Sequence, residues 1–358
     1  MIYYIGTIIL KTQHFFGASV TKQQTILRYI HQSEWLEQLT ATAVSDITFL
    51  AAGEYNENWI LTLTPSGSSN ASIRKIVFRI NHGSQINQGD NQITYEFNIL
   101  RALQHSGVTP VPFFHDAAAG QFDEAFDKGV LLMEYLEGTP LDYTTDLDHA
   151  ARIFSATHSQ PVPEAHDFIH QQDPIGDILT ESRGLLSRFA AHPKTAERKQ
   201  LEAYAATIEK LSDTYASVFA EEPQCIVNTE VNSGNFIINR PAGTAHLVDW
   251  EKAVVSCRYQ DLGHFLAPIT TLWKTDFVAA DEHKKAFLRN YKRHAGLSTP
   301  MEELYTLTQL LEKTFILRGL SWCYMAWYEY TQQDRTLKNS DTFQTIERYL
   351  DNIEWFLQ

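Results

Sequence analysis

Two stretches in the second half of the chain carry the most informative pattern in the sequence. Residues 228–238 read NTEVNSGNFII, and after a short turn residues 247–251 read LVDWE. Polar residues stand at the edges of short apolar runs, which is typical of short strands joined by rigid loops. Glu230, Asn235 and Asp249 offer the oxygen ligands that Mg²⁺ prefers. Turn formation by the asparagines and capping by the aspartate would explain the same residues without a ligand.

Length and charge limit the classes of protein. The chain has 358 residues, with 29 Lys+Arg against 43 Asp+Glu and a net charge of −14. This length suits two domains or one bilobal unit. So negative a charge argues against a nucleic-acid partner, because it repels phosphate backbones.

Cysteine spacing and hydropathy indicate a compartment. The three cysteines, Cys225, Cys257 and Cys323, are scattered and lack CxxC spacing. They predict neither a disulfide framework nor a zinc site. Apolar runs are interrupted by charges well before the roughly 18 residues that a membrane span needs. We therefore expect a cytoplasmic protein that works in a reducing compartment and has no membrane partner.

Periodicity changes along the chain. Apolar residues at helical spacing predict a helix over 21–39 and another over 93–103. Short runs rich in β-branched and aromatic residues predict strands at 47–50, 59–63, 73–80, 111–114 and 129–135. Beyond Pro140 the pattern is mainly helical, with short strands expected at 226–227, 236–239 and 246–248. The order indicates a strand-rich part followed by a helix-rich part.

The loop at 228–235 resembles the catalytic loop of the aminoglycoside phosphotransferase and choline kinase family, relatives of the protein kinases. The family pattern is His-Gly-Asp, four residues, Asn, and later Asp-Trp-Glu. On that pattern Glu230 takes the place of the catalytic Asp, and Asn235 and Asp249 match the residues that hold Mg²⁺. Asp261, in Gln-Asp-Leu-Gly, matches the Asp that supports the loop from behind.

The resemblance also implies nucleotide contacts in the first half. Residues 53–58 lie where the family has its nucleotide loop, so Gly53 and Asn56 are expected near the phosphates. Arg79 is expected to contact the α- and β-phosphates and to pair with Glu96 on the following helix. A plain hairpin and solvated surface charges would explain the same residues.

Residues 131–138, LLMEYLEG, resemble the hinge of the family. The resemblance implies that Glu134 and Leu136 meet the adenine edge through their backbone groups. An apolar strand that leads to a polar turn is common in any fold, so the position of the segment between the expected lobes carries the interpretation.

The helix expected over 317–330 contains two Trp and three Tyr. It resembles the aromatic helix that lines the acceptor pocket in choline kinase-like members. Trp322, Trp327 and Glu329 are accordingly expected to bind a cationic acceptor through ring faces and charge. Core packing would explain an aromatic helix equally.

Two positions of the loop depart from the family. Asn228 replaces the usual His, and Glu230 replaces the catalytic Asp. Glu keeps the charge and adds one methylene, and displacements of about 1 Å can cost about 100-fold in rate. Two functions follow: an ATP-dependent small-molecule kinase, or a catalytically silent nucleotide-binding pseudokinase. The residues retained support Mg-nucleotide binding more strongly than phosphoryl transfer.

The sequence thus predicts an α+β, bilobal protein kinase-like fold with a small antiparallel-sheet N-lobe and a larger, mainly helical C-lobe. Expected parts are an N-terminal extension and helix (1–44), a nucleotide-binding lobe (45–137) and a helical lobe with the catalytic loop and acceptor site (138–358). The expected cofactors are Mg²⁺ and ATP, with GTP as the alternative nucleotide. The expected acceptor is a small molecule with a hydroxyl group, of the amino alcohol, aminoglycoside or amino sugar class; its identity and the oligomeric state stay open.

Overall fold

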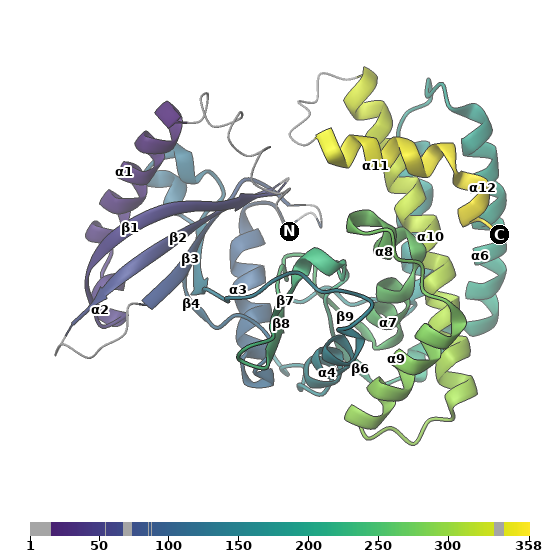
Figure 1. Ribbon diagram of the computed structural model, residues 1–358. Helices are drawn as coiled ribbons and strands as arrows, with labels where there is room; N and C mark the ends of the chain where they lie inside the picture. Colours follow the sequence, from purple (N-terminus) through teal and green to yellow (C-terminus); the bar gives the residue numbers. More distant parts are fainter. Residues whose placement is uncertain (1–15, 54, 67–73, 85, 87, 333–339) are drawn as a thin grey trace. The chain divides into compact units, whose positions relative to one another are not determined.

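The chain divides into two compact units. The structure is a computed structural model that describes residues 16–53, 55–66, 74–84, 86, 88–332 and 340–358 (Figure 1). One unit comprises Met1–Arg101 and Pro110–Tyr135, and the other Ala102–Thr109 and Leu136–Gln358. Glu54, the loop expected beyond Ser66 and the first fifteen residues lie outside the described part.

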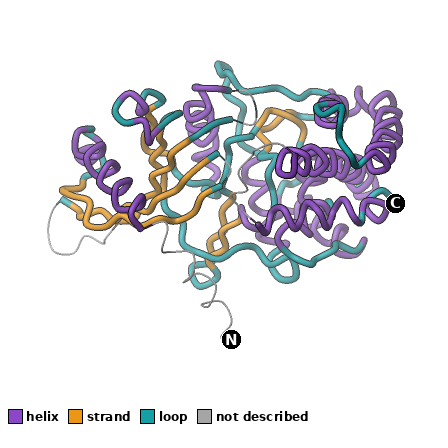
Figure 2. Tube along the Cα trace, turned by 90° about the horizontal axis from the view of Figure 1, so that it is seen from above, coloured by secondary structure: helices purple, strands orange, loops and turns teal. Residues whose placement is uncertain are grey.

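The first unit is built on a five-stranded antiparallel sheet in the order β1-β2-β3-β5-β4, whose strands can be followed in Figure 2. The strands are β1 (Ala41–Ala52), β2 (Asn56–Pro65), β3 (Arg74–Asn81), β4 (Pro112–Asp116) and β5 (Val130–Glu134). Three helices precede or separate these strands along the chain: α1 (Phe16–Gln32), α2 (Trp35–Gln38) and α3 (Gln92–Leu103). The strands and hairpins expected from the sequence are therefore present.

The core of this unit joins α1 to the sheet. Ile26, Tyr29 and Ile30 of α1 share one buried cluster with Trp59 and Phe78 of the sheet. The single helix expected over 21–39 is wrong, because it is interrupted after Gln32. At the interruption the Ser33 hydroxyl donates to the Ile30 carbonyl at 3.0 Å.

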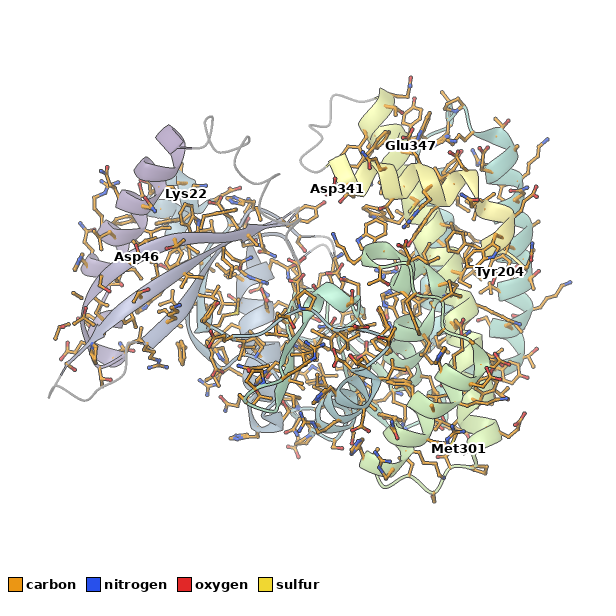
Figure 3. All side chains as sticks on the ribbon, viewed as in Figure 1. Lys22, Asp46, Tyr204, Met301, Asp341 and Glu347 are labelled. Carbon is orange, nitrogen blue, oxygen red and sulfur yellow. The ribbon has the colours of Figure 1, made fainter. Side chains whose placement is uncertain are left out.

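The second unit is mainly helical. Its helices are α4 (Leu147–His158), α5 (Pro174–Ser187), α6 (Thr195–Glu221), α7 (Tyr259–Leu266), α8 (Pro268–Lys274), α9 (Asp281–His294), α10 (Met301–Gln332), α11 (Ser340–Asp351) and α12 (Ile353–Phe356). Side chains fill the space among them (Figure 3). An antiparallel sheet followed by a mainly helical part confirms the expected α+β organisation. Within the described ranges, no helix is both long and apolar enough to span a membrane.

Four short strands interrupt the helices and carry the loops of interest. β6 (Gln224–Val227) pairs antiparallel with β9 (Val254–Cys257), and β7 (Phe236–Asn239) with β8 (Thr244–Leu247). The sequence predicted three of them and missed β9. Gly243 has φ +67°, the left-handed conformation in which glycine carries no side-chain clash, and it closes the turn between β7 and β8.

Candidate active site

Strand pairing brings two separate segments together. The loop 228–235 runs from the end of β6 to the start of β7, and the segment 248–253 runs from β8 to β9. Because β6 pairs with β9 and β7 with β8, the two segments lie side by side. The backbone N–H of Val248 donates to the carbonyl of Asn235 at 2.8 Å, which fixes their register.

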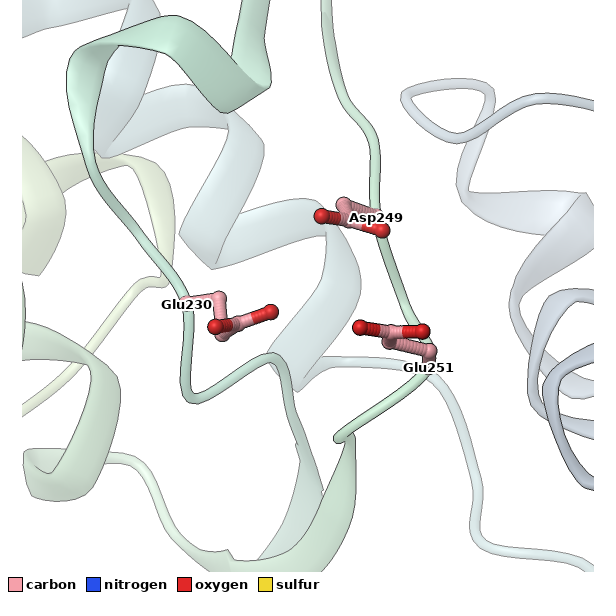
Figure 4. Close-up of side chains that lie close together, drawn as sticks. All are labelled: Glu230, Asp249 and Glu251. Carbon is pink, nitrogen blue, oxygen red and sulfur yellow. The ribbon is translucent and has the colours of Figure 1, made fainter. Parts of the chain in front are cut away.

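Three carboxylates converge between these segments. Glu230 reaches in from the loop, and Asp249 and Glu251 from the opposite segment (Figure 4). One ligand oxygen from each residue lies within 4.8 Å of the others. Glu251 is buried, whereas the other two are half-buried. Sequence reasoning did not select Glu251, although its place two residues after Asp249 in LVDWE was the available signal.

Asn235 lies in the same loop as Glu230. Its side-chain nitrogen donates to the backbone carbonyl of Glu230 at 2.7 Å, so the side-chain nitrogen is engaged inside the loop. The three carboxylates form a purely oxygen donor set, which fits Mg²⁺ and not a transition metal that needs nitrogen or sulfur. Coordination by the Asn235 side-chain oxygen stays a prediction.

Lys252 makes an ion pair with Glu230. The Lys252 Nζ lies 2.5 Å from Glu230 Oε1, and the two side chains are 8% and 25% exposed. The Lys252 carbonyl also accepts a hydrogen bond from the Thr229 hydroxyl at 2.9 Å. Nothing in the sequence distinguishes Lys252 from an ordinary surface lysine. It was therefore not among the residues expected at the site.

Asp261, in the first turn of α7, holds the loop from its buried side. Its fully buried carboxylate accepts hydrogen bonds from the backbone N–H groups of Asn228, at 2.9 and 3.0 Å, and Thr229, at 3.0 Å. His158 lies 3.2 Å away on the same carboxylate and 3.0 Å from the Tyr291 hydroxyl. Asp261 is therefore placed where a supporting residue must be, and its functional role stays a prediction.

Asn228, which stands where the family has His, connects the two segments. It is fully buried. Its side-chain nitrogen donates to the Asp249 carbonyl at 3.0 Å, and its side-chain oxygen accepts from the Glu230 N–H at 2.9 Å. The substitution therefore supplies both a donor and an acceptor to the backbone around the carboxylates.

The backbone of both segments is strained at one position each. Thr229 and Asp249 both have φ +64°. This left-handed conformation costs an L-residue about 1–2 kcal/mol, and it is least tolerated by β-branched residues such as Thr. The bonds of Thr229 to Asp261 and Lys252 offset that cost.

In the first unit, Arg79 and Glu96 form a buried ion pair. The Arg79 guanidinium lies 2.5 Å from Glu96, and the side chains are only 6% and 2% exposed. Its Nε donates to Asn58 Oδ1 at 3.0 Å on the neighbouring strand β2. The pairing expected from the sequence is present, and solvated surface charges do not describe it. Contact of Arg79 with phosphates stays a prediction.

The other residues assigned to nucleotide binding have ordinary structural contacts. The Gly53 N–H donates to the Asn56 carbonyl at 2.8 Å, which closes the turn between β1 and β2. Asn56 also accepts from the Asn81 side chain at 2.9 Å. The Glu134 N–H donates to the carbonyl of Val111, the residue just before β4, at 2.9 Å. Leu136 is half-buried. Their roles toward a nucleotide stay predictions.

The three residues expected to bind the acceptor make separate contacts. Trp322 packs edge-on against Trp273, with ring centroids 5.9 Å apart. Trp327 lies against His192, and the Lys194 ammonium lies 5.2 Å from its ring centroid. Glu329 is paired with Arg188 at 3.0 Å. These contacts are those of helix packing, and they do not unite Trp322, Trp327 and Glu329 around one space.

Known proteins resemble most of the chain. Residues 46–297 match the phosphotransferase enzyme family, and no curated protein matches. Among solved structures, an ethanolamine kinase of Plasmodium vivax is 12% identical, with a TM-score of 0.57 over 86% of this chain and 81% of that one. The choline kinase LicA of Streptococcus pneumoniae is 16% identical, with a TM-score of 0.55 over 90% and 97%.

Two further similar structures are complexes with nucleotides. An aminoglycoside 2′-phosphotransferase in complex with GDP is 12% identical, with a TM-score of 0.55 over 91% of this chain and 97% of that one. LicA is also matched in complex with AMP. At these identities the likenesses concern the fold, and they confirm the kinase-like α+β fold expected from the sequence.

Proposed function

We propose that this chain, which belongs to the phosphotransferase enzyme family, transfers the terminal phosphoryl group of ATP to a hydroxyl group of a small molecule. One observation carries the proposal beyond family membership. The oxygens of Glu230, Asp249 and Glu251 converge within 4.8 Å on two backbone segments that the buried Asp261 and Asn228 hold rigidly. Phosphoryl transfer depends chiefly on such positioning.

The donor set supports a division of roles. Asp249, Glu251 and the side-chain oxygen of Asn235 would hold Mg²⁺, which when bound neutralises charge on the transferred phosphoryl group. Glu230 would accept the hydrogen bond of the acceptor hydroxyl and orient it. Arg79, held by Asn58 and Glu96, would contact the phosphates of the nucleotide. Gly53, Asn56, Glu134 and Leu136 are proposed nucleotide neighbours from the resemblance alone.

The acceptor is proposed at the level of a chemical class. Amino alcohols, aminoglycosides and amino sugars are proposed because the family resemblance points to them and because a chain with a net charge of −14 attracts cations. Trp322, Trp327 and Glu329 add little to this choice, because each is engaged in a separate packing contact.

A two-stage experiment tests the proposal. Calorimetric titration with Mg-ATP and Mg-GTP comes first, and then turnover is measured against a library of amino alcohols, amino sugars and aminoglycosides. We expect nucleotide binding and turnover of at least one acceptor, and Glu230→Gln should lower that turnover by about 100-fold or more. The matched control is Glu347→Gln, an exposed glutamate on α11 that Figure 3 labels, which should leave turnover unchanged.

One observation favours a second function. The Glu230 carboxylate is already paired with Lys252, so its orientation of an acceptor hydroxyl must coexist with that ion pair. A catalytically silent nucleotide-binding protein is the alternative that this pair supports. Tight Mg-ATP binding without turnover on any acceptor would establish the alternative, and absence of nucleotide binding would exclude both functions.

A further inference from the structure

We infer that Lys252 is a positioning residue that divides the three converging carboxylates into two roles. By pairing with Glu230 it keeps this carboxylate for the acceptor hydroxyl and leaves Asp249 and Glu251 for the cation. The inference rests on the proposed function, because it assigns roles within that site. It concerns a residue that the family resemblance did not indicate.

The need for such a residue follows from the geometry of the cluster. Three carboxylates that lie within 4.8 Å of one another are chemically equivalent as ligands of a hard cation. Glu230 is one methylene longer than the Asp it replaces in the family pattern, so its carboxylate reaches further from the loop backbone. Without a competing partner, a bound cation would draw it in as an additional ligand.

Lys252 is suited to prevent this. Its ammonium lies 2.5 Å from Glu230 Oε1, and only 8% of its side chain is exposed. Its own carbonyl is tied to the Thr229 hydroxyl at 2.9 Å, so the backbone of Lys252 is held against the residue that precedes Glu230. A backbone link and a side-chain link between the same segments fix the ammonium relative to the carboxylate.

The charges around this pair leave Lys252 as its principal cation. Arg318 also acts on Glu230, but its Nε donates to Glu181 at 2.9 Å. His264 lies near Lys252, and its pKa is lowered well below its usual value by burial and by the charges of Arg318 and Lys252. It is therefore neutral and does not compete for Glu230.

The arrangement predicts opposite effects on two measurable quantities. Removing the ammonium in Lys252→Met frees Glu230 to join the cation. Affinity for Mn²⁺, used as the probe, should rise by about tenfold, since partners of metal ligands typically change affinity by about 10–100-fold. Turnover should fall by about 100-fold, because the carboxylate that orients the hydroxyl is displaced. A lysine that acted through its charge alone would raise Mn²⁺ affinity by the same factor whether or not Glu230 is present.

The experiment titrates the intact protein with Mn²⁺ alone and follows free Mn²⁺ by electron paramagnetic resonance, with turnover measured in parallel. Lys252→Arg should keep both values within about threefold of the wild type, because the ion pair persists. Relative to Glu230→Gln, the double variant Lys252→Met with Glu230→Gln should gain clearly less Mn²⁺ affinity than Lys252→Met gains over the wild type, because loss of the lysine charge still acts but no carboxylate is released. This double variant contains no unpaired charge at either position, so it also serves if Lys252→Met alone fails to fold: its Mn²⁺ affinity should then stay within about threefold of that of Glu230→Gln.

Two results overturn the inference, and they differ from failure of the proposed function. Unchanged or weaker Mn²⁺ binding by Lys252→Met, in a wild type that binds Mn²⁺ and turns over, removes the role given to Lys252 alone. A double variant that gains about tenfold in Mn²⁺ affinity over Glu230→Gln contradicts it as well, because Lys252 would then act through its charge alone and without Glu230. A wild type that binds neither nucleotide nor Mn²⁺ would overturn the proposed function itself.

Discussion

The two units each contain an ion pair of the same length in different surroundings. Arg79 and Glu96 meet at 2.5 Å with side chains 6% and 2% exposed, whereas Lys252 and Glu230 meet at 2.5 Å with side chains 8% and 25% exposed. Both side chains of the Arg79–Glu96 pair are buried. In the Lys252–Glu230 pair, the carboxylate is half-buried beside the carboxylates of Asp249 and Glu251.

This difference in exposure should give the two pairs different effects on stability. Both side chains of an enclosed ion pair are shielded from water, so removing one of them leaves the charge of the other buried and uncompensated. A pair with one open end loses less when broken, because water can solvate what remains. We therefore expect the first pair to dominate stability and the second to dominate turnover.

The largest effect on stability should come from breaking the enclosed pair. Glu96→Ala should lower the free energy of unfolding of the first unit by about 3–5 kcal/mol, since Arg79 would remain buried without its partner. Lys252→Met should cost about 1 kcal/mol in the second unit, since the Glu230 carboxylate that remains is 25% exposed and water can solvate it. Urea unfolding combined with hydrogen exchange of the β3 amides measures the first loss. Equal losses in the two variants would contradict the comparison.

Glu57 on β2 is an intermediate case that pH can resolve. Burial alone raises its pKa, but hydrogen bonds from His82, Lys22 and Trp59 outweigh burial and lower the pKa from 4.5 to about 2. Its side chain is 16% exposed, and Lys22 lies 2.6 Å away. A lowered pKa stabilises the folded state fully above about pH 4.5, and that contribution disappears as the pH falls toward 2.

Glu57→Gln should therefore destabilise the protein by roughly 3 kcal/mol at neutral pH. The difference from the wild type should shrink steadily as the pH falls below 4.5. Denaturant unfolding at several pH values measures it. A difference that is constant with pH would show that the charge of Glu57 is not what stabilises β2 against α1.

Weakening the hydrogen bonds that Asp261 makes behind the loop should have a smaller effect on stability. Asp261→Asn keeps an acceptor but loses the charge that strengthens its bonds to the Asn228 and Thr229 N–H groups. We expect a loss of about 2 kcal/mol, because hydrogen bonds to charged groups contribute about 1.5–3 kcal/mol. Hydrogen exchange of the loop 228–235 should accelerate while exchange in the first unit stays unchanged. Acceleration in both units would indicate general unfolding instead.

The smallest effect should come from the hydroxyl that links the two segments. Thr229→Val removes the hydrogen bond to the Lys252 carbonyl and keeps the β-branched shape, at a cost of about 1 kcal/mol. Thr229→Ser keeps the hydroxyl and serves as the control. Thermal unfolding compares the two variants, and a serine variant that is less stable than the valine variant would show that packing outweighs this bond.

The strands and helices of the first unit followed closely from the sequence, because alternating and helical periodicities record which side of each element is buried. The exception is the helix expected over 21–39, which is interrupted between Gln32 and Trp35. The missed strand β9 has the sequence Val-Val-Ser-Cys. Its partner β6 lies about thirty residues earlier, so pairing and not local pattern defines it.

Only part of the candidate site could be identified from the sequence. Glu230, Asn235 and Asp249 were selected because oxygen ligands at the ends of short apolar runs are a local pattern. Glu251 was within the quoted stretch and could have been selected with them. The aromatic residues of α10 were less informative, because the same residues serve packing: Trp322 and Trp327 lie against different neighbours.

By itself, the sequence determined the order of sheet and helices, the family and the residues with oxygen ligands at loop ends, since these depend on neighbours along the chain. The pairing of Lys252 with Glu230 across 22 positions is visible only in the tertiary structure, whereas the place of Asp261 behind the loop was expected from its motif. The Lys252 contact is set by strand pairing, in which small changes of register move a side chain by several ångströms. The proposed roles of the three carboxylates therefore rest on a lysine that no local pattern indicates.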